Sequence, residues 1–292
     1  MPAAYWIERT EIVKLHVPLL AIGVLLASAH APASAVVVRH DVSDERYRVR
    51  AQDIPQLVDM PNVGHGVLIA PRWVVTAAHT IQGDVNSVTI GGVSRAVDHV
   101  EIHPGYRNVP SDIIQRALET GNAIEINQFL AGTDDIALIR LSQPINDIEP
   151  IRIYSGNGEV GKTVQFFGKG ATGTGLTGAP PTSPQRGELR RAFNRIDAAD
   201  GRWIVYTFDD GRSAHRLEGM AGSGDSGGPV LVRVRGLWTL AGMMSWKGGD
   251  DVDVRQPGSR YGQPAYNVRL SHYAEWIQET LGKSGDRIVL RQ

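Results

Sequence analysis

The chain has 292 residues and a net charge of −1, with 30 basic and 31 acidic side chains, 42% hydrophobic residues and no cysteine. This composition is that of a globular protein with one large or two modest cores, and nucleic acid is a poor candidate partner for it. The absence of cysteine excludes disulfides, thiolate metal sites and cysteine nucleophiles.

Residues 1–35 have the features of a secretory signal peptide. Arg9 and Lys14 precede an apolar run of 13 residues at 15–27, and Ala33-Ser34-Ala35 is a small-x-small cleavage signal. The run is short for a membrane span, so we predict a cleaved signal peptide and keep an uncleaved membrane anchor as the alternative. We expect cleavage after Ala35 and a secreted or periplasmic protein that packing alone stabilises.

The rest of the chain is predicted to form many short strands, because 33 glycines and 16 prolines favour frequent turns. Runs rich in β-branched and aromatic residues recur at 66–70, 73–76, 87–90, 93–100, 136–141, 159–167, 189–196, 203–208, 229–234 and 237–245.

Four other segments complete the predicted organisation. Residues 110–130 suggest a helical or mixed excursion, 143–150 a connection between two halves, and 168–187 an irregular loop. Apolar residues at a spacing of four predict a terminal helix over 272–281.

These elements favour an all-β fold of two antiparallel six-stranded barrels closed by a C-terminal helix. The first barrel is expected over 36–150 and the second over 151–292.

Two patterns typical of phosphate binding are rejected. Residues 156–163 fit G-x-x-x-x-G-K-[ST] and residues 173–178 fit G-x-G-x-x-G. Such loops bind phosphate when a helix follows them. Here an alternating β-type run follows the first and two prolines follow the second, so a nucleotide site is the weakest of the functions considered.

Three segments instead supply the partners of a nucleophilic mechanism. Ser226 lies among glycines at 222–228, a setting that leaves a hydroxyl exposed and directs backbone N–H groups to one point. His79 ends a run of small residues after an apolar strand, and Asp135 stands at the start of another strand. Each residue alone is more often structural, but together they provide a nucleophile, a base and a carboxylate that orients the base.

The three blocks at 76–79, 135–138 and 224–229 resemble the signature blocks of the trypsin/chymotrypsin-like serine protease family, in the family's order. The resemblance extends over about residues 36–281 and implies the two-barrel fold and peptide-bond hydrolysis. It implies that Ser226 attacks the scissile carbonyl, that His79 transfers the proton and that Asp135 orients His79.

The same resemblance assigns supporting roles. Gly224 and Ser226 would provide the backbone N–H groups of the oxyanion hole. Ser245 would donate a hydrogen bond to Asp135, and Ser245, Trp246 and Lys247 would pair with the substrate as an added strand. Thr80 replaces the cysteine usual after the histidine, in keeping with a chain that has no disulfide.

Specificity departs from that of trypsins. Met220, with Ala221 beside it, stands at the expected base of the primary pocket, where trypsins carry an aspartate. Cleavage after Lys or Arg is therefore not expected. Met244 replaces the histidine of glutamyl-specific relatives, which argues against an acidic preference. Lys247 replaces a rim glycine and would either narrow the entrance or attract an acidic side chain; the sequence leaves both open.

Activation in the family uses a new Ile or Val N-terminus that pairs with the acid before the serine, here Asp225. Val36 and Val38 are the candidates, although the glycines that usually follow are missing. We expect signal cleavage after Ala35 to expose the activating end.

The chain is thus predicted to be a secreted serine endopeptidase without cofactor or metal, acting on protein or peptide substrates. A proteinaceous inhibitor is a further candidate partner. The alternative is a catalytically silent binding protein on the same scaffold. Asp250, Asp251 and Asp253 are compatible with either a calcium site or a solvated loop.

Overall fold

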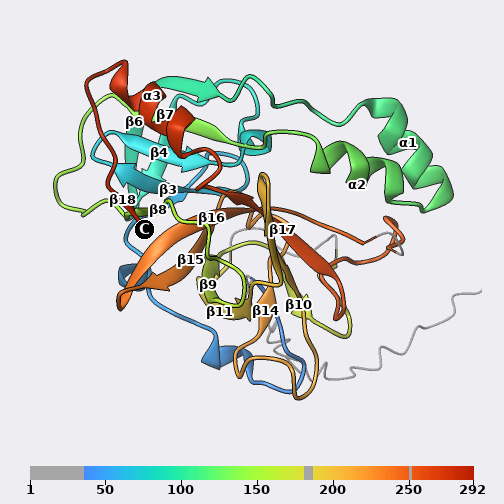
Figure 1. Cartoon of the computed structure of the whole chain (residues 1–292). Coiled ribbons are helices and arrows are strands. Elements are labelled where there is room, and N and C mark those ends of the chain that lie inside the picture. The colour runs from blue at the N-terminus through green and yellow to red at the C-terminus, as the bar shows by residue number, and fades with distance from the viewer. Residues whose placement is uncertain (1–35, 181–186, 250–251) are drawn as a thin grey trace, which may run out of the picture. The chain divides into compact units, whose positions relative to one another are not determined.

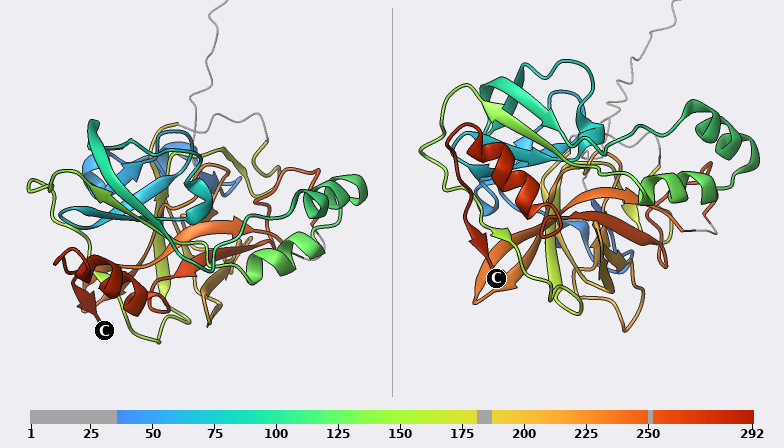
Figure 2. Two further views of the ribbon diagram at one scale, coloured as in Figure 1. Left: turned by 90° about the horizontal axis from the view of Figure 1, so that it is seen from above. Right: turned by 45° about the horizontal axis from the view of Figure 1, so that its top comes forward.

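The computed structural model describes residues 36–180, 187–249 and 252–292, and strands dominate them. The predicted signal segment, 1–35, lies outside the described residues. Figures 1 and 2 show two groups of strands, joined along the chain, with helices at their margins.

Six strands in the first half close into a barrel, in the order β2-β3-β4-β7-β6-β5. Closure pairs every strand on both sides and leaves no exposed edge. Apolar side chains such as Val58, Leu68 and Ile139 fill the barrel. The strands are β2 (Leu57–Asp59), β3 (His65–Ala70), β4 (Trp73–Thr76), β5 (Ser87–Ile90), β6 (Val93–Ile102) and β7 (Ala137–Leu141).

The second half forms a curled nine-stranded sheet, in which β11-β9-β15-β16-β17-β13-β12 is the main path and β8 and β18 attach at the side. The predicted second barrel is therefore open along its hydrogen-bonded path, which ends at β11 and β12. The strands are β8 (Ile153–Tyr154), β9 (Thr163–Gly168), β11 (Arg190–Arg195), β12 (Ala198–Asp200), β13 (Trp203–Thr207), β15 (Pro229–Val234), β16 (Leu237–Lys247), β17 (Pro264–Arg269) and β18 (Leu290–Arg291).

The first strand does not belong to the first barrel. Strand β1 (Val36–Val38) lies between β10 (Thr172–Thr174) and β14 (Gly219–Met220) in a separate three-stranded sheet. All three of its valines are buried in the core cluster of the second half. The start of the described chain is therefore packed in the second half, between β10 and β14.

A shared apolar cluster holds the two halves together. It joins Val67 and Trp73 of the first barrel to Leu231 and Leu240 of the second sheet, and Ile277 of the terminal helix packs into it. Burial of this kind stabilises by about 25 cal/mol per Å² of apolar surface. The two halves are therefore joined by a continuous apolar core.

The predicted excursion at 110–130 forms two helices, α1 (Ser111–Thr120) and α2 (Ile124–Ala131), which project from the sheets in Figures 1 and 2. Gly121 ends α1 with φ 79°, a conformation that glycine adopts without the strain of a Cβ. The predicted terminal helix is confirmed as α3 (Ala274–Gly282). Short 3-10 helices span Asp44–Arg46, Ala51–Asp53 and Ala78–Thr80.

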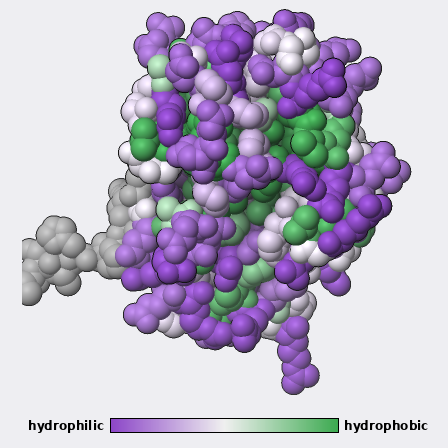
Figure 3. Space-filling view, turned by 90° about the vertical axis from the view of Figure 1, so that its left-hand side faces the viewer, coloured by the Kyte–Doolittle hydropathy of each residue, from purple (hydrophilic) through white to green (hydrophobic). Residues whose placement is uncertain are grey.

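The predicted all-β fold class is confirmed, with a closed barrel, a half-barrel and a C-terminal helix. One face of the molecule is predominantly hydrophilic and carries separated apolar patches (Figure 3). Within the described residues, no helix has the length and apolar character needed to cross a membrane.

Candidate active site

His79 and Asp135 meet because their strands are neighbours. His79 lies in the 3-10 helix after β4, and Asp135 lies just before β7. These strands pair with Thr76 opposite Ala137, so the two ends coincide. His79 Nδ1 is 2.7 Å from Asp135 Oδ2, and the His79 backbone N–H donates to Asp135 Oδ1 at 2.9 Å.

The pair is asymmetric in exposure and in charge. Only 5% of the Asp135 side chain is exposed, whereas 39% of the His79 side chain is exposed. Burial opposes the charge on each group, but their mutual attraction and hydrogen bond prevail, raising the pKa of His79 and lowering the pKa of Asp135. With Nδ1 turned to the carboxylate, Nε2 is the nitrogen with which His79 can accept a proton.

Ser245 of β16 reaches the same carboxylate from the second sheet. Its hydroxyl donates a short hydrogen bond to Asp135 Oδ2. The pairing of β16 with β17 shifts register between Met244 and Trp246, so the irregularity falls at Ser245. Bulges of this kind re-aim a side chain, here across the boundary between the two halves.

Ser226 lies in the glycine-rich segment between β14 and β15, and both conformation and space require glycines around it. Gly224 has φ 93° and Gly227 has φ 76°, values that side chains rarely allow. A Cβ on Gly227 would lie 2.0 Å from the carbonyl oxygen of His65. The His65 N–H donates to the carbonyl of Ser226 at 2.7 Å, which ties the segment to the first barrel.

Asp225 belongs to the same segment, and its side chain is fully buried. Its carboxylate accepts hydrogen bonds from the N–H of Gly170 at 2.6 Å and of Gly222 at 2.8 Å. Burial raises the pKa of Asp225. A buried carboxylate of this kind is a place where a positive charge is strongly favoured.

His79 and Ser226 line one cavity of about 420 Å³ between the two halves. Most of the predicted binding residues also line it, namely Ala221, Gly224, Ser245, Trp246 and Lys247. The arrangement puts a hydroxyl, an imidazole that rests on a carboxylate and a glycine-rich backbone around one space, as acyl transfer requires.

Met220 is the predicted binding residue that the structure does not bring to this cavity. It is fully buried in β14, where it pairs with Val37 of β1. Its side chain belongs to the apolar core of the second half, together with the valines of β1.

Other lining residues escaped the sequence analysis. Val63 and Gln82 come from loops of the first barrel, and Ala265, Tyr266 and Asn267 come from β17. The β17 residues reach the cavity because β17 pairs with β16, with Ala265 opposite Lys247. Predicting these three residues would have required the register of β16 and β17, which no local sequence pattern specifies.

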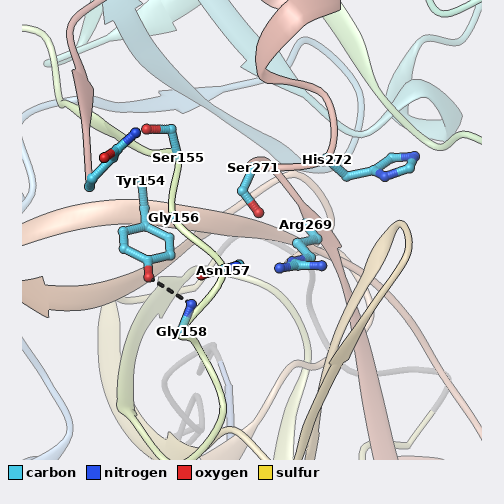
Figure 4. Close-up of a pocket in the computed structure, with 9 residues that line it drawn as sticks. Tyr154, Ser155, Gly156, Asn157, Gly158, Arg269, Ser271 and His272 are labelled. Carbon is cyan, nitrogen blue, oxygen red and sulfur yellow. Dashed lines mark hydrogen bonds between the residues drawn. The ribbon is translucent and has the colours of Figure 1, made fainter.

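The segment at 156–163 has the structure of a turn between strands β8 and β9. The Gly158 N–H donates to the Tyr154 hydroxyl at 3.1 Å, and Arg269 and Ser271 lie across a cavity of about 560 Å³ (Figure 4). Because no helix follows, the loop lacks the N–H array that holds a phosphate. The rejection of a nucleotide site is supported.

No group of three His, Asp or Glu side chains in the described part of the chain is arranged to hold a metal ion. Of the three aspartates named as calcium candidates, Asp250 and Asp251 lie outside the described residues. Asp253 forms an ion pair with Arg255 at 2.8 Å.

Comparison with known proteins gives consistent results. The family model described as Trypsin matches residues 45–277. Snake venom serine proteinase 14 of Crotalus adamanteus is 29% identical over 232 residues, which cover 76% of this chain and 78% of the venom protein. Tryptase of Mus musculus is 27% identical over 230 residues, 75% of this chain and 78% of the tryptase.

A solved structure of neuropsin, a serine protease from mouse brain, has a similar fold. It superposes with a TM-score of 0.58 at 20% identity, covering 80% of this chain and 98% of neuropsin.

Proposed function

The chain belongs to the trypsin family of serine proteases, and on that basis we propose that it is a secreted serine endopeptidase that cleaves protein or peptide substrates. The observation that carries the proposal is the hydrogen-bonded pair of Asp135 and His79 on the same cavity as Ser226. The 1–35 segment supports secretion through its sequence alone.

The proposed reaction begins with attack of the Ser226 hydroxyl on the scissile carbonyl. His79 takes the hydroxyl proton and then gives it to the leaving amine, which departs as the acyl-enzyme forms. Water then attacks the ester by the same route and restores Ser226. Asp135 remains ionised throughout, in keeping with its lowered pKa, and stabilises the imidazolium.

The backbone N–H groups of Gly224 and Ser226 form the proposed oxyanion hole. The positive φ of Gly224 supports this role, because it turns the peptide plane in a way that a residue with a side chain would resist. One donor of this kind contributes about 2.7–4 kcal/mol to transition-state stabilisation.

Cleavage after Lys or Arg is not proposed. None of the described residues that line the cavity is acidic, and one of them, Lys247, is basic. A basic substrate side chain would enter without a counter-charge and beside a like charge.

The proposed activating residue is Val36. It lies opposite Thr172 of β10, two residues beyond Gly170, which donates to Asp225. Its φ of 63° is unfavourable for a β-branched residue, and cleavage before Val36 removes that constraint. Val38 lies at the far end of β1, opposite Thr174, and is the poorer candidate.

The test of the proposed function is hydrolysis of a diverse peptide library by the chain that begins at Val36. Ser226→Ala is expected to lower kcat by roughly a million-fold while the protein stays folded. The matched control is Ser94→Ala, on the exposed strand β6 of the first barrel, which should leave the rate unchanged. Equal rates for the Ser226 variant and the native enzyme would reject the proposal.

A further inference from the structure

Lys247 occupies an unusual place for a lysine. It ends strand β16 and lines the cavity that contains His79 and Ser226. Its Cε lies 3.2 Å from the position that a Cβ on Gly258 would take, so the side chain extends from β16 toward the segment at 257–259.

That segment is itself fixed against the cavity wall. The Ser259 hydroxyl donates to the carbonyl of Ala221 at 2.7 Å, and the carbonyl of Gly258 accepts from the Ala179 N–H at 2.9 Å. Ala221 lines the same cavity as Lys247. The aliphatic stem of Lys247 therefore lies between β16 and a fixed loop, and the half-buried side chain forms part of the wall between this cavity and the neighbouring one that Gly258 lines.

Within residues 36–180, 187–249 and 252–292, no carboxylate forms an ion pair with the Lys247 ammonium, whereas the ammonium of Lys169 pairs with Asp59. Burial lowers the pKa of Lys247, and the charge of Asp225 opposes that shift. Asp225, however, is engaged by the N–H groups of Gly170 and Gly222.

The rest of the cavity wall combines polar groups such as Gln82 and Ser223 with apolar side chains, and the apolar part makes a substrate charge costly unless Lys247 balances it. Trp246 stacks on Tyr266 with ring centroids 3.7 Å apart, and Met244 and Ala265 add further apolar surface. An isolated charge taken from water into such surroundings is strongly disfavoured, and a partner of opposite sign reverses the preference.

From these contacts we infer that Lys247 makes this cavity select an acidic side chain, glutamate or aspartate, at the residue whose carbonyl is cleaved; the inference rests on the proposed function. The carboxylate of the substrate pairs with the Lys247 ammonium, and each supplies the charge that the other lacks. The selecting group is thus at position 247, on the pocket rim, and the methionine at 244 takes no part in the charge recognition.

Asn267 lines the cavity and carries a buried acceptor that would favour a cationic substrate group over this pairing. Its Oδ1 is buried without a hydrogen-bond partner among the described residues, and such an oxygen prefers a donor. A substrate lysine would satisfy it, but only by bringing a second ammonium close to Lys247. The repulsion between the substrate ammonium and the Lys247 ammonium in one cavity outweighs the attraction of a single neutral acceptor.

The alternative role of Lys247 is purely steric. A long side chain that only fills the cavity would favour small substrate residues, such as alanine, whatever their charge. Glutamate and glutamine distinguish the two roles because they have nearly the same size and differ in charge.

The experiment measures kcat/KM for one peptide series that varies only at the residue before the cleaved bond, with Glu, Gln, Asp, Asn, Ala, Leu and Lys. The enzymes are the native chain, Lys247→Met and Lys247→Arg, each beginning at Val36. A fluorophosphonate titration counts the competent Ser226 in each preparation, so that rates are compared per active site.

We expect the native enzyme to prefer Glu over Gln, or Asp over Asn, by roughly tenfold or more, and Lys247→Met to abolish that ratio. Lys247→Arg should retain it, because the charge is kept. Titrated enzyme that shows no acid-to-amide preference, or prefers alanine in every variant, overturns the inference and leaves the proposed protease function intact. Enzyme that neither titrates nor cleaves any peptide overturns both.

Discussion

Ser245 donates its hydroxyl to Asp135 Oδ2, the same oxygen that lies 2.7 Å from His79 Nδ1. The other oxygen, Oδ1, accepts the backbone N–H of His79. Both oxygens of a nearly buried carboxylate are therefore used, and they are used by residues from both halves of the molecule. This network orients the imidazole toward the cavity that it shares with Ser226.

The contribution of Ser245 is measurable. Ser245→Ala removes one hydrogen bond to a buried charge, an interaction worth about 1.5–3 kcal/mol. We expect kcat/KM to fall by roughly 10- to 100-fold, with a smaller effect on KM. Steady-state kinetics beside Ser94→Ala provide the check, and a variant as active as the control would show that Asp135 needs no support from β16.

The pH dependence follows from His79. The base must be neutral to accept the proton, and interaction with Asp135 raises the pKa of His79 above 6.5. The kcat/KM for a peptide with a neutral residue before the cleaved bond should rise with pH, through a midpoint above 6.5, to an alkaline plateau. A midpoint below 6.5 would contradict the electrostatic account of the pair.

A separate group, Glu218, links stability to pH. Burial raises its pKa from 4.5 to about 8, against hydrogen bonds from the N–H groups of His215 and Asp209. Between these values the folded chain keeps a proton that the unfolded chain releases. The stabilising contribution is therefore complete below pH 4.5 and is lost as pH rises through about 8.

The variant Glu218→Gln stays neutral and should lose less stability than the native chain over that interval. Thermal unfolding midpoints at several pH values test this, with Glu275→Gln on the exposed face of α3 as the control. Parallel curves for the native chain and the Glu218 variant would show that the buried carboxyl does not titrate in this range.

Activation by the Val36 end makes another prediction. A single glycine placed before Val36 moves the new ammonium away from Asp225 and leaves that buried carboxylate uncompensated. Loss of one partner from a buried pair costs about 3–5 kcal/mol, so the active fraction should fall by roughly 100-fold or more. Fluorophosphonate titration of both N-terminal forms measures it, and equal titres would exclude Val36 as the activating residue.

How far the sequence determines this structure depends on how local each feature is. Strand β4 and strand β15 coincide with the predicted runs, because alternation and flanking turns are encoded within a few residues. The cluster of His79, Asp135 and Ser226 was predictable because each lies in a short segment whose residue types are dictated by its own backbone and chemistry.

The features that sequence reasoning missed depend on long-range packing. The open path of the second sheet and the presence of β17 in the cavity follow from strand register, which local patterns do not specify. Met220 pairs with Val37 of β1 and shares a buried core cluster with it, although the two residues are more than 180 positions apart in the chain. The sequence leaves two roles open for Lys247, and the inference in favour of an acidic substrate depends on the position of its stem beside Gly258 and on its place in the cavity wall, which no local pattern specifies.

The most direct test of the central claim is mass spectrometry of the chain beginning at Val36 after treatment with a fluorophosphonate. The account predicts one adduct per molecule, on Ser226, and a strongly reduced rate of labelling in His79→Ala because the base is gone. A folded protein that takes up no label on Ser226, or labels equally fast without His79, would contradict it.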